Sequence, residues 1–147
     1  MNNSLVEHVF DLALWLAGTG HFVILIASFQ VPHRLQWQKD LARLMPFNRK
    51  LLWVQGGFTV LTIIAFGTLT LTLHSEMLRG DRSALGIAAF IGAYWTARVV
   101  VDAFYFSHTD WPKGRQFAIG HILLTSLFSS LATTYLGLFI WRVWLNK

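Results

Sequence analysis

Four long apolar segments constrain this chain more than any other feature of its sequence. They run at about 9–31, 51–73, 85–106 and 117–143. Each is long enough for an α-helix to cross the hydrocarbon core of a membrane. The second segment, "LLWVQGGFTVLTIIAFGTLTLTL", contains no charged residue, whereas a helix of a soluble bundle would need a polar face. The sequence therefore predicts an all-α polytopic membrane protein, a single domain over 1–147 with four transmembrane helices in one bundle.

The composition is typical of a membrane protein, and the sequence excludes several kinds of functional site. Charged residues make up only 13% of the chain, about half the fraction typical of soluble domains, and the mean hydropathy is +0.49. The chain has no cysteine, which excludes disulfides and metal sites held by thiolates. No nucleophile motif, P-loop or glycine-rich nucleotide pattern occurs. The sequence thus favours a protein without catalytic activity of its own.

The distribution of basic residues predicts the orientation in the membrane, because cytoplasmic loops carry an excess of Lys and Arg. The loops after the first and third segments are the more basic side. They hold Arg34, Lys39, Arg43, Arg49, Lys50, Lys113 and Arg115, against Arg79, Arg82, Arg142 and Lys147 on the opposite side. We expect these two loops in the cytoplasm and both termini outside it, in what we interpret as a bacterial inner membrane protein.

The segment between Pro32 and Pro46 has the pattern of a short amphipathic helix on the membrane surface. Its apolar residues recur at helical spacing and its polar residues fall largely on the other side: Trp37, Leu41, Leu44 and Met45 against Gln36, Lys39, Asp40 and Arg43. Basic amphipathic helices lie in the interface and attract anionic lipids. We therefore expect anionic lipids at the 34–50 loop, which either anchors the chain or docks a cytoplasmic partner. Nucleic acid is not an expected partner, because the positive charge lies close to the membrane.

Every apolar segment carries a strongly polar side chain in its predicted cytoplasmic half. His21, Gln55 and His121 lie in the first, second and fourth segments, and Arg98 and Asp102 both lie in the third. Ionisable residues within a span are functional candidates by default, and their small neighbours predict that they face other helices. Arg98 and Asp102 are four residues apart, so we expect an ion pair on their own helix. Gln55 is expected to form a hydrogen bond between helices.

His21 and His121 each follow a glycine, and three interpretations of them stay open. Each histidine can hydrogen-bond a neighbouring helix. The two can instead supply the axial ligands of haem b or a related tetrapyrrole, with Arg98 facing a propionate. The pattern of Ala17, His21 and Leu25 is similar to the bacteriochlorophyll-ligating stretch of bacterial antenna polypeptides, and this resemblance implies a tetrapyrrole at His21. The third interpretation is a proton or substrate path through the ionisable residues of the spans.

Histidines and carboxylates also occur at the opposite membrane surface. His8, Asp11, His74 and Glu76 would all lie near this surface. Such residues can hold zinc when they meet. Solvated helix ends are the expected interpretation here.

Together these features favour a small accessory or scaffold protein, either a homo-oligomer or a subunit of a larger membrane complex. Its small loops, its aromatic content and the absence of a catalytic motif support this hypothesis. The first alternative is a haem-binding protein in electron transfer, which depends on His21 and His121. The second is a small transporter or proton-path protein, which depends on Arg98 and Asp102.

Overall fold

The structure is a computed structural model that describes residues 3–34, 36–106 and 114–145, and these residues form helices and turns without any strand. Four of the helices are long and apolar enough to cross a membrane, which confirms the all-helical prediction and indicates an integral membrane protein. They are α1 (Asn3–Ser28), α4 (Pro46–Thr72), α6 (Arg82–Phe104) and α7 (Arg115–Ile140). Lys113 and Lys147, which enter the orientation prediction, lie outside the described residues.

Short helical segments connect or extend the long helices. They are α2 (Val31–Arg34), α3 (Trp37–Ala42), α5 (His74–Arg79) and the π-helical turn η2 (Trp141–Leu145). The first long helix ends at Ser28, earlier than the sequence predicts, and Pro32 lies in the first turn of α2, where proline is tolerated. Pro46 begins α4, because its fixed φ suits a first helical position. Between the two prolines, helix is found only in α2 and in the six residues of α3.

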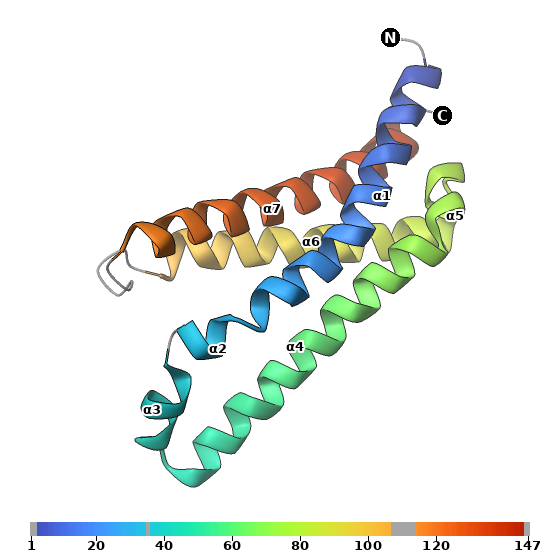
Figure 1. Cartoon of the computed structure of the whole chain (residues 1–147). Coiled ribbons are helices and arrows are strands. Elements are labelled where there is room, and N and C mark those ends of the chain that lie inside the picture. Colours follow the sequence, from blue (N-terminus) through green and yellow to red (C-terminus); the bar gives the residue numbers. More distant parts are fainter. Residues whose placement is uncertain (1–2, 35, 107–113, 146–147) are drawn as a thin grey trace.

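A left-handed glycine ends α5 and turns the chain into α6. Gly80 has a φ of 85°, and its N–H donates to the carbonyls of Glu76 and Met77 at 3.1 and 3.2 Å. The Asp81 N–H donates to the Glu76 carbonyl as well, at 3.0 Å. Glycine adopts this φ without steric cost, and such residues commonly end helices. This turn brings α6 back beside the end of α4 (Figure 1).

Figure 1 shows two helical hairpins that converge at one end and diverge at the other. In one hairpin α1 packs along α4, and in the other α6 packs along α7. The hairpins contact each other mainly through α1 with α7 and through α5. They converge near α5 and the chain termini and diverge towards α3. We call these two ends of the molecule the terminus end and the α3 end.

The buried core lies towards the terminus end of the long helices. Buried residues begin at Ile63 in α4 and at Phe128 in α7, and they end at Trp95 in α6. No residue is buried in the described segments 46–62, 96–104 and 115–127. Lipid solvates apolar side chains as well as a protein core does. Apolar residues at the α3 end therefore need no cover from this chain.

Two glycines bring the helices of each hairpin into close contact within the core. A methyl group on Gly67 would lie 2.8 Å from the Phe22 ring and 3.1 Å from the His21 Cβ. A methyl group on Gly92 would lie 2.9 Å from the Leu136 side chain and 3.2 Å from its backbone nitrogen. Small residues are typical of such close approaches between membrane helices. They hold α4 against α1 and α6 against α7.

Candidate functional site

His21 is fully buried in the core, and both of its ring nitrogens lie within hydrogen-bond distance of partners. Nδ1 lies 2.7 Å from the Ala17 carbonyl oxygen, and Nε2 accepts the indole N–H of Trp95 at 3.0 Å. The carbonyl can only accept and the indole can only donate, so these partners assign a neutral ring with its proton on Nδ1. His21 therefore joins α1 to α6 through a satisfied hydrogen bond.

Aromatic rings from three helices surround His21. The ring centroids of Trp95, Phe66 and Tyr135 lie 5.5, 6.1 and 6.1 Å from that of His21. The Tyr135 and Thr70 hydroxyls lie 2.6 Å apart, and Thr70 donates to the Phe66 carbonyl. The hydrogen bond of Trp95 was not predicted from the sequence. The signal was available, because a buried indole N–H needs an acceptor, whereas no sequence pattern pairs Thr70 with Tyr135.

The two histidines of the haem prediction lie in different surroundings. His121 lies outside the core with a side chain 27% exposed, beside Asp102. At His21, a tetrapyrrole iron on Nε2 would have to displace the Trp95 N–H, while the Ala17 carbonyl holds the other nitrogen. The surroundings of His21 thus fit the hydrogen bond between helices that the sequence left open. Ligation of haem b or another tetrapyrrole by His21 and His121 stays a prediction.

Asp102 is paired with α7 and not along its own helix. Its Oδ2 accepts the Thr125 hydroxyl at 2.9 Å and lies 3.6 Å from His121 Nε2. Arg98 instead places its guanidinium carbon 5.6 Å from the centre of the Phe128 ring. Arg98 forms no ion pair in the described part of the chain, so the predicted ion pair between Arg98 and Asp102 is wrong. The α6–α7 hairpin presents a hydroxyl and an imidazole to the short Asp102 side chain, and the longer Arg98 reaches an aromatic face.

Gln55 lies on the open half of α4, and its amide has no hydrogen-bond partner among the described residues. The expected hydrogen bond to another helix is therefore not made within the described chain. A methyl group on Gly56 or on Gly57 would meet no atom within 4 Å. The Thr59 hydroxyl is satisfied differently, since it donates to the Gln55 carbonyl at 3.0 Å.

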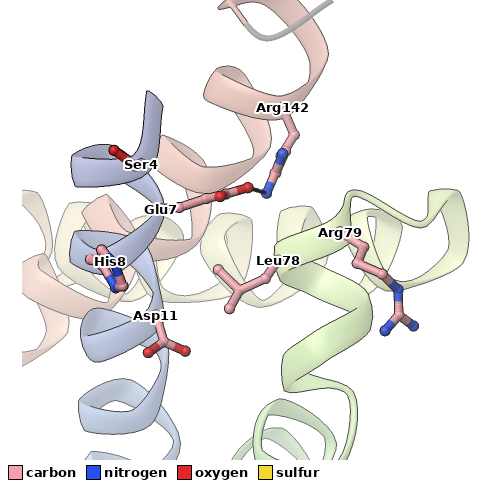
Figure 2. A pocket seen from close by; sticks show the side chains of 7 residues that line it. All are labelled: Ser4, Glu7, His8, Asp11, Leu78, Arg79 and Arg142. Atoms are coloured by element: carbon pink, nitrogen blue, oxygen red, sulfur yellow. Dashed lines mark hydrogen bonds and ion pairs between the residues drawn. The ribbon is translucent and has the colours of Figure 1, made fainter. Parts of the chain in front are cut away.

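A hollow of about 500 Å³ lies at the terminus end and is lined by charged side chains of α1, α5 and η2 (Figure 2). Arg142 donates to Glu7 across it at 2.7 Å. His74 Nε2 lies 3.3 Å from the Asp11 carboxylate and 3.2 Å from the Asp11 carbonyl oxygen. In the described residues no three His, Asp or Glu side chains are grouped to hold a metal ion, so the zinc alternative finds no support. These carboxylates fasten α1 to η2 and α5.

Comparisons with known proteins give no relative from which a function could be inferred, so the function is inferred from the residues and their geometry. A scan against protein-family models, a search of curated proteins and a search of solved structures each find no match to this chain. Among the sequence-predicted site residues, the structure brings Asp102 and His121 together and holds His21 in the core. It leaves Gln55 uncovered on α4.

Proposed function

We propose that this chain is a small integral membrane accessory or scaffold protein that packs against a partner or against copies of itself. The Gln55 amide carries this proposal, because it has no partner among the described residues. An amide without a hydrogen bond costs free energy in hydrocarbon. A helix from another polypeptide would supply the missing partner. The chain needs no catalysis of its own for this role.

The position of Gln55 along α4 supports contact within the hydrocarbon. Gln55 lies about one and a half turns beyond Lys50, or roughly 7.5 Å at 1.5 Å per residue. Its neighbours Trp53, Val54 and Phe58 are exposed apolar side chains that suit a lipid environment. Gln55 therefore lies inside the apolar span, where a protein partner would satisfy its amide better than lipid can.

The glycines beside Gln55 support close approach by that partner. Gly56 and Gly57 have open space where a side chain would be, and small residues with polar groups are typical of interfaces between membrane helices. The divergence of the two hairpins leaves the α3 end uncovered (Figure 1). A docked helix would cover this half of the molecule, as the packing of α1 against α7 covers the other half.

The placement of the chain in the membrane is part of the same proposal. We take α3 as the interfacial helix, with the loops at the α3 end in the cytoplasm and both termini outside, in a bacterial inner membrane. The basic residues Lys39, Arg43, Arg49 and Lys50 near α3 support this orientation. The edge-to-face contact of Trp37 with Trp53, at 6.3 Å between ring centroids, supports a fixed position of α3 beside α4.

The test compares two substitutions on the exposed surface of α4. Gln55→Leu removes the amide from the open half, and Thr68→Val removes an exposed polar group from the packed half. Association is measured by energy transfer between donor- and acceptor-labelled copies in vesicles at increasing lipid dilution, and by the yield of polypeptides that co-purify from native membranes. We expect Gln55→Leu to weaken association by about 0.6–1.7 kcal/mol, the range for polar contacts between membrane helices. Thr68→Val should leave it unchanged.

The proposal is wrong if Gln55→Leu behaves like the unmodified chain in both measurements. It is also wrong if Gln55→Leu and Thr68→Val weaken association equally, because a general loss of polarity would then explain the effect.

A further inference from the structure

A second hollow, of about 460 Å³, lies at the α3 end between the end of α1, the short helices and the start of α4. Its lining divides into apolar side chains and side chains that donate hydrogen bonds. These are Phe29, Pro32, Trp37 and Trp53 on the one hand, and His33, Gln36, Gln38 and Lys39 on the other. The described residues that line this hollow include no carboxylate. We call it the tryptophan hollow.

Two observations indicate that the tryptophan hollow has a defined shape. The Trp37 and Trp53 rings meet edge to face, with an interplanar angle of 70°, which links the short α3 to α4. Gln36, immediately before α3, has a φ of 51° in the left-handed region. A residue other than glycine stays in that region only when its surroundings hold it there.

The charges of the two hollows differ. The two arginines that line the hollow at the terminus end face carboxylates: Arg142 is paired with Glu7, and Arg79 with Glu76 and Asp81. In the tryptophan hollow, Lys39 forms no ion pair with any described carboxylate. The first hollow neutralises itself, whereas the second presents an ammonium group beside amide donors. Such a lining is complementary to an anion, and lysine commonly binds phosphate.

We propose that the tryptophan hollow binds the head of one anionic phospholipid. Lys39 and the amides of Gln36 and Gln38 would hold the phosphodiester, and the acyl chain would lie along Phe29 and Trp37. A lipid matches this lining better than free phosphate, because half of the lining is apolar and would make no favourable contact with an inorganic ion. Basic pockets at the cytoplasmic side of membrane proteins bind lipid head groups in this way. This inference rests on the proposed surface position of α3.

The exposed apolar surfaces next to the tryptophan hollow also favour a phospholipid as its occupant. Phe29 is 75% exposed and Trp53 is 51% exposed. Phe29 directly follows α1, and Trp53 lies about two turns inside α4. An acyl chain leaving the hollow would therefore pass directly onto the lipid-facing surfaces of α1 and α4. Tryptophan is typical of this depth in a membrane.

The experiment uses the full chain in phosphatidylcholine vesicles with a minor fraction of phosphatidylglycerol carrying brominated acyl chains, which quench tryptophan fluorescence on contact. We expect quenching to saturate at a lower fraction of brominated phosphatidylglycerol than of brominated phosphatidylcholine. Trp37→Phe and Trp53→Phe should each remove part of this selective quenching. Lys39→Gln should raise the half-saturating fraction ~fivefold, which corresponds to about 1 kcal/mol per basic residue at a membrane surface. Lys50→Gln, with the same charge change outside the hollow, should raise it less than half as much.

Three results would overturn the inference in distinguishable ways. Equal quenching by the two brominated lipids would remove the lipid site while keeping α3 at the membrane surface. If neither lipid quenches Trp37, judged by the difference from Trp37→Phe, then the surface position of α3 is wrong as well. Inorganic phosphate that abolishes the selective quenching, where sodium chloride at equal ionic strength does not, would assign the hollow to the free anion. Docking through Gln55 is measured separately by energy transfer, so it stands or fails independently.

Discussion

Glycine occurs in both halves of the long helices, but its surroundings differ between them. At Gly67 and Gly92 a methyl group would overlap atoms of the neighbouring helix, whereas at Gly56 and Gly57 it would meet nothing. A glycine inside a helix costs about 0.5–1 kcal/mol relative to alanine. Close packing offsets this cost at the terminus end. At the α3 end nothing in the described chain offsets it, which is expected if another helix packs there.

Polar side chains divide between the two halves in the same way. At the terminus end His21 accepts from Trp95 and the hydroxyls of Thr70 and Tyr135 meet. At the α3 end the Gln55 amide has no described partner. The polar groups around His21 are therefore satisfied internally, although Arg142 Nε at the terminus end is buried without a hydrogen-bond partner among the described residues. In the open half Asp102 is paired with Thr125, and the Gln55 amide is left for an external partner.

The largest expected effect is the loss of the buried imidazole. His21→Ala empties a fully buried position and leaves the Trp95 N–H without an acceptor, so we expect the free energy of unfolding to fall by about 2–5 kcal/mol. His33→Ala, at an exposed position of the α3 end, is the matched control and should change it by less than about 0.5 kcal/mol. Unfolding in mixed detergent micelles measures both. Similar losses for the two variants would contradict the division into a packed half and an open half.

The next effect compares the glycines directly. Gly92→Ala places a methyl group 3.2 Å from the Leu136 backbone nitrogen, which cannot rotate away, so we expect a loss of about 1–3 kcal/mol from overpacking. Gly57→Ala meets no atom and should gain up to about 1 kcal/mol from helix propensity. The same micelle titration measures both changes. A loss at Gly57 in the isolated chain would show that the α3 end is packed internally after all.

The sequence predicted the elements that the bilayer itself dictates. Helix number and approximate position follow from the length of the apolar segments, because the hydrocarbon thickness fixes how many residues cross it. The start of α4 was not predicted, because the apolar segment begins at about 51 whereas the helix already begins at Pro46. The inward direction of His21 follows from Gly18, which approaches Leu71 of α4 so closely that a methyl group would lie 2.6 Å from it.

The partners of the polar groups were not predictable in the same way. Periodicity places Asp102 on the inward face of α6, but whether Arg98 or Thr125 reaches it depends on how α6 and α7 are rotated against each other. The divergence of the hairpins likewise depends on crossing geometry, which hydropathy does not encode. Apolar side chains are as well solvated in lipid as in a core, so the sequence carries no sign of which half is packed.

The smallest expected effect concerns Asp102, which pairs either across the hairpin with Thr125 of α7 or along α6 with Arg98. A double-mutant cycle of Asp102→Ala with Thr125→Val measures the contact across the hairpin, seen as a hydroxyl 2.9 Å from the carboxylate. We expect a coupling energy of about 0.6 kcal/mol, and no more than about 1.7 kcal/mol, as for other polar contacts between membrane helices. A second cycle of Asp102→Asn with Arg98→Gln tests the pairing along α6. It should give a coupling near zero, because the Arg98 guanidinium lies over Phe128. If the second coupling exceeds the first, the ion pair along α6 is the true arrangement, and the open half then satisfies its charges without help from α7.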